Sequence, residues 1–298
     1  MTLPRTKQVL PSRPRARYNI PVMNEKKQIT VAFQGEFGAN SEDAVRAVYP
    51  AGRPVPCRTL RDVFAAVAGG ATDYAVVPVE NSQAGSINDT YDLLLDSHDR
   101  LYITAEYNLR VRHMLLGLPG QRLETVHTVT SHPQALAQSE RYLSVLGVKI
   151  EPAYDTAGAA RRIATESLQD VAAVASRAAA ATYGLAILAE NIETSDDNYT
   201  RFLALGREKA ASPRTKTSLV MSTRNTPGSL YHALGPFAAR GVNMIKLESR
   251  PSRARPWEYI FYLDVEGDAE EEPLRSALGA LHGLTPMLTI LGSYSTLT

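Results

Sequence analysis

The fold is decided by residues 28–41, Gln-Ile-Thr-Val-Ala-Phe-Gln-Gly-Glu-Phe-Gly-Ala-Asn-Ser. Residues 29–33 form a short apolar run, which predicts a buried strand. The glycine-containing loop that follows ends at Ser41, which is placed to cap a helix whose first turn carries Glu42 and Asp43. A strand, a loop and a helix in this order are the repeating unit of an α/β protein.

The same alternation continues along the chain to residue 185. Further strands are predicted at residues 74–79, 126–130, 148–154 and 171–175, separated by helical stretches. This order predicts parallel sheets with helices on both faces. In such sheets, ligands bind beyond the carboxyl ends of the strands.

The residues that follow these strands are small and polar. The strand exits carry Gly35, Asn81 with Ser82, Gly85 and Ser86, Ser131, Thr156, and Ser176. Such residues bind carboxylates through backbone N–H groups and hydroxyls, although each one alone is explained equally well by local helix capping. Because five exits agree, the sequence predicts an anion-binding cleft.

A second domain begins near residue 216. Residues 208–215 interrupt the alternation and are interpreted as a linker. The predicted order beyond it is strand 217–222, helix 229–239, strand 243–248, strand 259–265, helix 271–281 and strand 287–291. This βαββαβ order is the ferredoxin-like arrangement.

Composition narrows the function classes. A chain of 298 residues is long enough for two domains, and its net charge of +1 argues against nucleic acid as a partner. No apolar stretch approaches the roughly 20 residues that cross a bilayer, so no membrane association is expected. The single cysteine, Cys57, cannot form an intrachain disulfide, which fits a reducing cytoplasm, and it has no evident base partner. The six histidines include no pair at helical ligand spacing, so no metal site is expected.

Residues 1–27 differ from the rest of the chain. They carry seven basic residues and the single acid Glu25, and are interpreted as a disordered basic extension. An organelle-targeting peptide would also be basic and poor in acids, but Pro4, Pro11 and Pro14 disfavour the amphipathic helix that it requires.

Residues 200–202 combine a hydroxyl, a cation and an aromatic ring directly before an apolar run. This trio suits a small anionic substrate that must lose a hydroxyl. In a strand, Thr200 and Phe202 share one face, so Arg201 needs a local bend or a second lobe to join them. The alternative is an edge strand with a solvated arginine.

Taken together, these motifs resemble those of the prephenate dehydratases of phenylalanine biosynthesis, over about residues 28–295. The matching segments are residues 35–44, 78–82 with Gly85 and Ser86, 131–136 with Gln138, 175–185 and 200–202. Residues 225–230 and 248–251 resemble the amino-acid-binding ACT domain. The resemblance implies an α/β fold with a two-lobed catalytic region like that of periplasmic binding proteins, followed by a ferredoxin-like ACT domain at 216–295. The expected lobes are residues 28–105 plus 186–207, and 106–185.

The resemblance implies conversion of prephenate to phenylpyruvate, carbon dioxide and water, without a metal or cofactor. Thr200 would donate or relay the proton to the leaving hydroxyl, Arg201 would bind a carboxylate, and Glu80 would be the ultimate proton source. The expected substrate-binding residues are Asn81, Ser82, Gly85, Ser86, Ser131, Gln138, Thr156, Ser176 and Phe202, the last as a wall against water.

The resemblance also implies regulation. L-phenylalanine is the expected effector, in a homodimer or homotetramer, bound by Asn225, Pro227, Gly228, Ser229, Leu230, Glu248, Ser249 and Arg250. No chorismate mutase segment precedes residue 28, so a monofunctional enzyme is expected. Three alternatives stay open: an arogenate dehydratase, a non-catalytic amino-acid sensor, and an ACT domain that serves only dimerisation.

Overall fold

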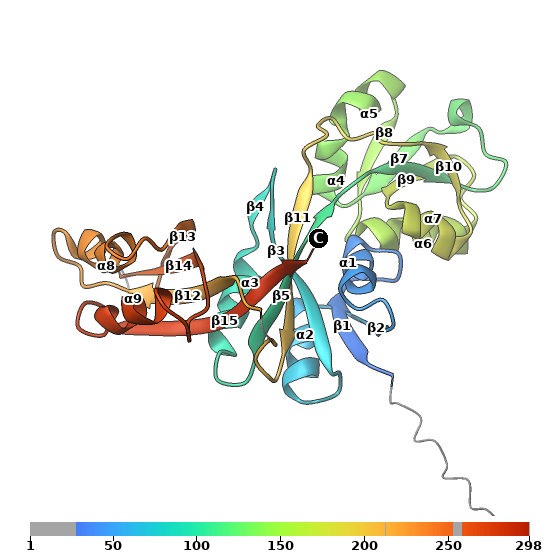
Figure 1. Ribbon diagram of the computed structural model, residues 1–298. Coiled ribbons are helices and arrows are strands. Elements are labelled where there is room, and N and C mark those ends of the chain that lie inside the picture. The colour runs from blue at the N-terminus through green and yellow to red at the C-terminus, as the bar shows by residue number, and fades with distance from the viewer. Residues whose placement is uncertain (1–27, 212, 253–257, 298) are drawn as a thin grey trace, which may run out of the picture.

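The computed structural model describes residues 28–211, 213–252 and 258–297, so the extension predicted at 1–27 lies outside the described residues. Figure 1 shows three parts in a row: lobe 2, lobe 1 in the middle, and a C-terminal domain. The two lobes are joined by two crossing segments of chain, and a long strand joins the C-terminal domain to lobe 1.

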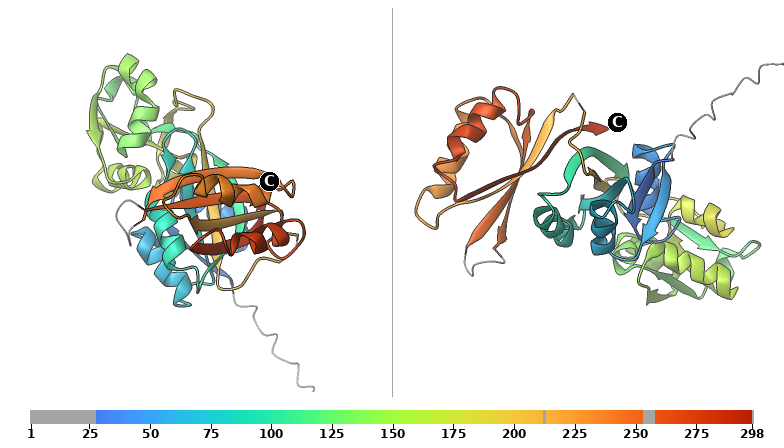
Figure 2. Two further views of the ribbon diagram at one scale, coloured as in Figure 1. Left: turned by 90° about the vertical axis from the view of Figure 1, so that its left-hand side faces the viewer. Right: turned by 90° about the horizontal axis from the view of Figure 1, so that it is seen from below.

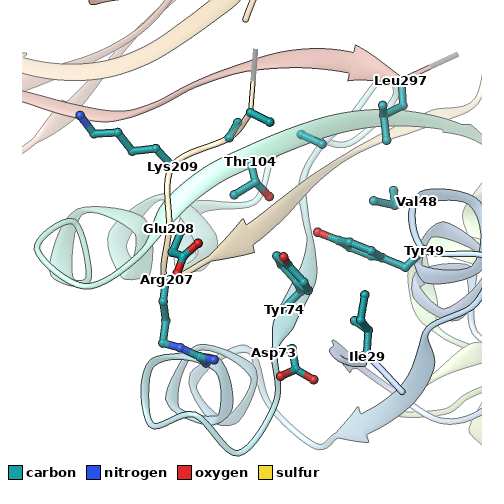
Figure 3. Close-up of a pocket in the computed structure, with 13 residues that line it drawn as sticks. Ile29, Val48, Tyr49, Asp73, Tyr74, Thr104, Arg207, Glu208, Lys209 and Leu297 are labelled. Carbon is teal, nitrogen blue, oxygen red and sulfur yellow. The ribbon is translucent and has the colours of Figure 1, made fainter. Parts of the chain in front are cut away.

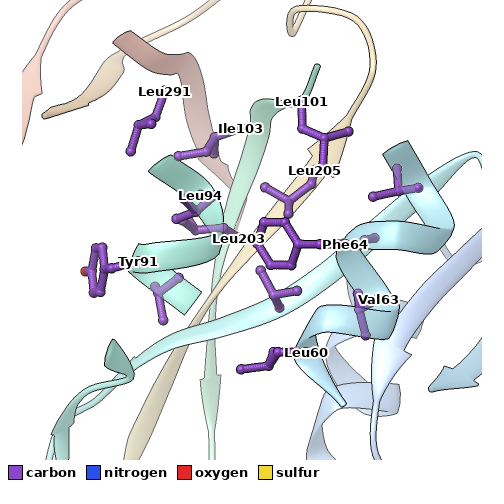
Figure 4. Close-up of a cluster of buried hydrophobic side chains, with 14 of the residues drawn as sticks. Leu60, Val63, Phe64, Tyr91, Leu94, Leu101, Ile103, Leu203, Leu205 and Leu291 are labelled. Atoms are coloured by element: carbon purple, nitrogen blue, oxygen red, sulfur yellow. The ribbon is translucent and has the colours of Figure 1, made fainter. Parts of the chain in front are cut away.

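Lobe 1 is a mixed sheet with helices on both faces. Its elements are β1 (Thr30–Gln34), α1 (Asn40–Val48), β2 (Arg53–Cys57), α2 (Leu60–Ala68), β3 (Tyr74–Asn81), β4 (Gly85–Ser86), α3 (Asn88–Asp96), β5 (Tyr102–Arg110) and β11 (Tyr199–Gly206). Alternate side chains of β1 point to opposite faces, so Ala32 packs under α2 and α3, while Val31 and Phe33 pack under α1. Figure 4 shows the larger of these two clusters, to which Phe64 of α2 and Leu203 of β11 both belong.

The predicted cap of α1 was wrong. The helix begins at Asn40 after Ala39, and the Ser41 side chain makes no capping bond. Glu42 in the first turn instead anchors the preceding loop, because its carboxylate accepts a hydrogen bond of 2.6 Å from the Gly38 backbone N–H, and a carboxylate is favourable at this helix end.

Lobe 2 is a five-stranded sheet in the order β10-β6-β9-β7-β8. Its elements are β6 (Met114–Gly117), a short 3₁₀ helix (Leu123–Thr125), β7 (Thr128–Ser131), α4 (Pro133–Gln138), α5 (Glu140–Leu146), β8 (Lys149–Pro152), α6 (Thr156–Glu166), β9 (Val171–Ala175), α7 (Arg177–Tyr183) and β10 (Ala186–Ala189). The chain leaves lobe 1 after β5 and returns after β10, later than the expected boundaries at 105 and 185.

Neither sheet is purely parallel, which differs from the sequence prediction. β1, β2 and β3 are parallel, but β11 is antiparallel to both β3 and β5. The reason is topological: β5 carries the chain towards lobe 2 and β11 brings it back, so these neighbours must run in opposite directions.

The C-terminal domain has the predicted βαββαβ order. Its elements are β12 (Lys216–Ser222), α8 (Ser229–Ala238), β13 (Met244–Pro251), β14 (Tyr259–Glu266), α9 (Leu274–Leu281) and β15 (Met287–Leu297). Strand β15 runs beyond its predicted end at residue 291 and pairs with β5 in parallel. This pairing joins the sheet of the C-terminal domain and the sheet of lobe 1 into one ten-stranded sheet. Figure 2 shows this strand passing from the domain into lobe 1.

The junction between β15 and β5 depends on a close backbone approach at Gly292. A Cβ atom at this position would lie 2.5 Å from the Ile103 carbonyl oxygen. Such a contact requires the backbone to shift, so only glycine fits here.

We predict that Gly292→Ala lowers the free energy of unfolding by about 1–3 kcal/mol, the usual cost of forcing an extra carbon into a packed site. Gly279→Ala is the matched control. Gly279 lies in α9, and a Cβ atom there would have no neighbouring atom within 4 Å, so this change should stabilise the protein by up to about 1 kcal/mol. Urea denaturation measures both, and equal stabilities of the two variants would contradict the close approach.

Candidate active site

Thr200 and Asn81 form the centre of the candidate site, where β11 begins and β3 ends. The two residues are register partners in the antiparallel pair. The Asn81 side-chain amide donates to the Thr200 hydroxyl oxygen at 3.0 Å, to Asn198 Oδ1 at 2.9 Å and to the Tyr199 carbonyl at 3.1 Å. No described residue accepts a hydrogen bond from the Thr200 hydroxyl, so its own proton is available to a ligand.

Side-chain amides extend this centre into lobe 2. Gln134 and Gln138, both on α4, donate to Asn81 Oδ1 at 3.3 and 3.5 Å. Gln138 Oε1 in turn accepts from the buried Asn198 at 3.0 Å. The same Asn81 oxygen accepts from the backbone N–H groups of Gln83 and Ala84, which orders the loop after β3. The amide network therefore couples both lobes to the position of Thr200.

His113 completes the network. It is buried, and its Nε2 lies 2.8 Å from Gln138 Oε1. Since Gln138 Oε1 can only accept, His113 Nε2 must be the protonated nitrogen. Burial lowers the pKa of His113, against the opposing effects of Gln138 and Glu193, so the imidazole is neutral near pH 7.

Lobes 1 and 2 also touch through the loop after β1. A Cβ at Gly38, whose φ is +84°, would lie 2.7 Å from Ala179 Cα in α7. Ser176, the residue that caps α7, donates to the Gly38 carbonyl at 2.6 Å, and Tyr183 donates to the Phe37 carbonyl at 2.7 Å. These contacts hold the loop after β1 against the residues that follow β9.

Arg201 and Glu80 lie on the opposite face of the sheet from Thr200. Arg201 forms ion pairs of 2.6 Å with both Glu106 and Asp264, and Glu80 pairs with Lys246 at 2.9 Å. Burial opposes the charge on Arg201, but Asp264, Tyr294 and Glu106 outweigh it and raise its pKa. Strand alternation is the cause of this placement, because the irregularity in the pairing falls after Arg201 and does not turn its side chain. Arg201 and Glu80 therefore do not point to the candidate site, in contrast to the contacts with substrate that were expected for them.

Several other predicted substrate contacts are engaged elsewhere. Phe202 is 2% exposed in the core under α1 and does not wall the cleft. Ser86 donates to Glu248 of the C-terminal domain, on the Arg201 face. Ser131 is fully buried and donates to the Val174 carbonyl. Ser82 bridges to the chain around Tyr199, with its hydroxyl donating to the Asp197 carbonyl.

Two of the predicted residues lie at a turn and at a helix start. Gly85 has φ +80°, a conformation that favours glycine, in the turn between β3 and β4. Thr156 is the first residue of α6, where the Asp155 side chain caps the helix. The structure thus brings together Thr200, Asn81, Ser82 and Gln138, with Gly85 paired to Asn81, whereas Ser176 contacts the loop after β1.

The predicted effector residues fall into two groups. Residues 225–230 open α8, with Gly228 at φ +79°, and the strand register places them at the same end of the sheet as Arg250. Glu248 and Arg250, however, turn towards lobe 1, where Arg250 pairs with Asp92 at 2.9 Å. Strand alternation leaves Ser249 on the other face, exposed.

A cavity of about 630 Å³ lies at the other end of the lobe 1 strands from Thr200. Figure 3 shows its lining, with Arg207 on the other side of Tyr74 from Tyr49. The rings of Tyr49 and Tyr74 stack with their centroids 4.8 Å apart. The Arg207 guanidinium donates to the Val67 and Thr72 carbonyls. The cavity shares no lining residue with the amide network, and its arginine is occupied by backbone carbonyls.

The described residues offer no evident set of ligands for a metal ion. Among residues 28–211, 213–252 and 258–297, no group of three or more His, Cys, Asp or Glu residues is arranged to hold a metal ion. In the same part of the chain, no helix is long and apolar enough to cross a membrane.

Comparison with known proteins identifies the family. Residues 31–210 match the family model described as prephenate dehydratase, and residues 217–283 match that of the ACT domain. This chain belongs to the prephenate dehydratase family. The predicted family and fold class are confirmed, and lobes 1 and 2 form the dehydratase domain that precedes the ACT domain.

Three relatives show the range of similarity. Arogenate dehydratase/prephenate dehydratase 2 from Arabidopsis thaliana is 45% identical over 280 residues, which cover 90% of this chain and 73% of that protein. The prephenate dehydratase of Arthrobacter aurescens, solved in complex with L-Phe, is 30% identical with a TM-score of 0.82, over 90% of each chain. GqqA, described as a novel type of quorum quenching acylase, is 38% identical with a TM-score of 0.83, over 90% of this chain and 98% of its own.

The expected cytoplasmic location is contradicted. The Arabidopsis thaliana relative above is a chloroplastic protein, as are two further relatives that are each 42% identical. The physical reason for the error is that a single cysteine excludes an intrachain disulfide but does not distinguish one reducing compartment from another.

Sequence reasoning missed His113, Asn198 and Gln134 as members of the site. His113 was considered only as a metal ligand, and its neighbours along the chain form no motif. Asn198 lies two residues before Thr200, and Gln134 lies inside the segment 131–136 that supports the family resemblance. Only those two positions carried a signal that could have included them.

We predict that His113 makes stability depend on pH. Its pKa is lowered by folding, so the unfolded chain binds a proton first as the pH falls through about 6.5, and stability is lost from there downwards. At about pH 5.5 the loss is at most about 1.4 kcal/mol, the value for a native imidazole that stays neutral. Urea denaturation of wild type and His113→Gln at about pH 7.5 and 5.5 measures it. Equal pH dependence in both proteins would contradict the buried neutral imidazole.

Proposed function

We propose that this protein catalyses the decarboxylative dehydration of prephenate to phenylpyruvate in phenylalanine biosynthesis, and the equivalent reaction of arogenate. The bond from the ring carbon to its carboxylate breaks, and carbon dioxide leaves. The electron pair of that bond enters the ring, the ring hydroxyl departs with its own bonding pair, and one proton from the surrounding water converts it to water. Aromatisation supplies the driving force, so the protein's task is to bind the dianion and assist the leaving hydroxyl.

The observation that carries the proposal is the hydrogen bond from Asn81 to Thr200. It occupies a lone pair of the Thr200 oxygen and leaves the hydroxyl proton available at the junction of the lobes. Donation of that proton towards the departing hydroxyl strengthens as negative charge develops, and accepting from Asn81 reinforces it through cooperativity. Asn81 therefore positions the hydroxyl, and Thr200 is the catalytic residue.

Neutral groups suit the binding of this substrate. Gln138, Thr156, Ser82 and Gly85 remain proposed substrate contacts. Ser131 and Ser176, whose hydroxyls donate to backbone carbonyls, would act through the loops that they hold. With Arg201 turned away, no guanidinium is directed to the ring carboxylate by the Thr200 strand. This arrangement avoids stabilising a charge that must be lost in the transition state.

Regulation by L-phenylalanine is part of the proposal. Support comes from the ACT match, from the Arthrobacter aurescens relative solved with L-Phe, and from the strand register that puts residues 225–230 and Arg250 at one end of the sheet. Asn225, Pro227, Gly228, Ser229, Leu230 and Ser249 are the proposed contacts. Glu248 and Arg250 would act from the lobe 1 side, where their charges are paired.

A homodimer or homotetramer is also proposed. Strand β13 is an edge of the ten-stranded sheet, and it exposes Ile245 and Leu247 to 48% and 43%. An exposed apolar edge strand favours pairing with a second copy. Sedimentation of the purified protein at the mass of one chain would contradict this assembly.

Acyl hydrolysis is the second reaction suggested by a relative, and the site does not favour it. A nucleophilic mechanism needs a hydroxyl or thiol beside a base. In the described part of the chain, no serine is hydrogen-bonded to a histidine, and burial raises the pKa of the Cys57 thiol, which disfavours the thiolate.

The function is tested by incubating the purified protein with prephenate or arogenate at neutral pH and following phenylpyruvate or phenylalanine. We expect turnover of prephenate, and inhibition when phenylalanine is added. Absence of product from both substrates would contradict the dehydratase assignment, and turnover that phenylalanine leaves unchanged would contradict the regulation.

We predict that Thr200→Ala lowers kcat at least about tenfold, because removal of one donor to a developing oxyanion costs about 10²–10³ in comparable sites. Thr200→Ser should retain most of the turnover, since it keeps the hydroxyl. Thr104→Ala is the matched control, because its hydroxyl donates to the Ala204 carbonyl and contacts Tyr49 at the far end of the same sheet, away from Thr200. Wild-type kcat in Thr200→Ala would remove Thr200 from the mechanism.

A further inference from the structure

A buried group of four charges joins the ACT domain to the dehydratase domain. Arg201 and Glu106 come from lobe 1, and Lys216 and Asp264 come from the ACT domain. Arg201 pairs with Glu106 and Asp264 at 2.6 Å each, and Lys216 pairs with Glu106 at 2.7 Å. All four side chains are 14% exposed or less. Two positive and two negative charges balance, but each domain supplies only half of them.

A second set of contacts lies next to the first. Lys246 on β13 of the ACT domain binds Glu80 at 2.9 Å and Glu248 at 3.0 Å, and it also donates to Ser86 at 3.3 Å. Arg201 Nη1 lies 3.7 Å from the same Glu80 carboxylate. ACT side chains therefore hold both Arg201 and Glu80, which are register partners on β11 and β3.

The pair held by the ACT domain is adjacent to the pair at the candidate active site. In the strand register, Thr200 faces Asn81 and the next residues, Arg201 and Glu80, face each other. Alternation directs the first pair to the junction of the lobes and the second to the ACT domain. One peptide unit in each strand thus connects an interdomain ion pair to a residue of the site.

The charges make this connection stiff. Breaking a buried ion pair leaves an uncompensated charge in a medium of low polarity, which is strongly unfavourable. When β13 or β14 moves, Arg201 and Glu80 are therefore expected to move with it, because their ion pairs stay intact. Their strands then change the separation of Thr200 and Asn81, on which alignment with the leaving hydroxyl depends.

We propose that Arg201 is a positioning residue of the dehydratase reaction, held by Asp264 so that the state of the ACT domain sets the orientation of the Thr200 hydroxyl. The inference rests on the proposed function and names the path by which an effector would regulate it. It requires that the effector bind with different affinities to two arrangements of the ACT strands.

The test is Asp264→Asn in the full chain, which keeps the side-chain shape and removes the charge. The matched control is Asp268→Asn, another buried ACT aspartate, whose partner at 2.6 Å is Arg214, a residue outside the dehydratase strands. For Asp264→Asn we expect kcat on prephenate to fall about fivefold or more, KM to change less than about twofold, and the inhibitory concentration of phenylalanine to shift, as expected for lost alignment. Asp268→Asn should change none of these three quantities.

A second pair of variants provides the test if Asp264→Asn does not fold. Lys246→Met releases Glu80, and Lys209→Met is its control, because Lys209 pairs with the exposed Glu270. The same split between kcat and KM is expected for Lys246→Met alone. Steady-state kinetics that match the controls for whichever variant folds would overturn the inference. An inactive wild type would instead overturn the proposed function.

Discussion

The antiparallel pairing of β3 with β11 is the constraint on which the rest of the structure depends. These strands meet where the chain returns from lobe 2, so their paired ends lie at the junction of the two lobes. Because side chains alternate, one pair of residues at this point faces the junction and the next faces the ACT domain. A one-residue change of register would exchange the two sets and place buried charges where the amide network now lies.

The continuous sheet extends this constraint to the whole chain. Strand β15 pairs with β5, which pairs with β11, so the ACT domain shares a hydrogen-bonded sheet with the strands that carry the site. A flexible linker alone would let the domains move independently. The shared sheet and the buried ion pairs connect the two domains rigidly, which the proposed regulation by a bound amino acid requires.

Local patterns were sufficient to predict much of this architecture. The apolar runs gave the strands, and the βαββαβ order of the ACT domain was correct, because local periodicity decides such elements. The extension of β15 and the partners of Arg201 could not be predicted, since both depend on residues far apart in the sequence. Within the site, Thr200 and Asn81 followed from strand exits and family motifs, whereas His113 has no local signal. The side chains of Arg201 and Glu80 are paired with charged residues on the far face of the sheet, and Phe202 is buried under α1. Residue type alone does not reveal such partners.

The central claim is that Asn81 acts on the reaction by holding the Thr200 hydroxyl. A double-mutant cycle on kcat tests it most directly, with Asn81→Ala introduced into wild type and into Thr200→Ala. The account predicts that Asn81→Ala lowers kcat strongly in wild type and only slightly once the threonine hydroxyl is gone. The same fold-reduction in both backgrounds would show that the two residues act independently and would contradict it.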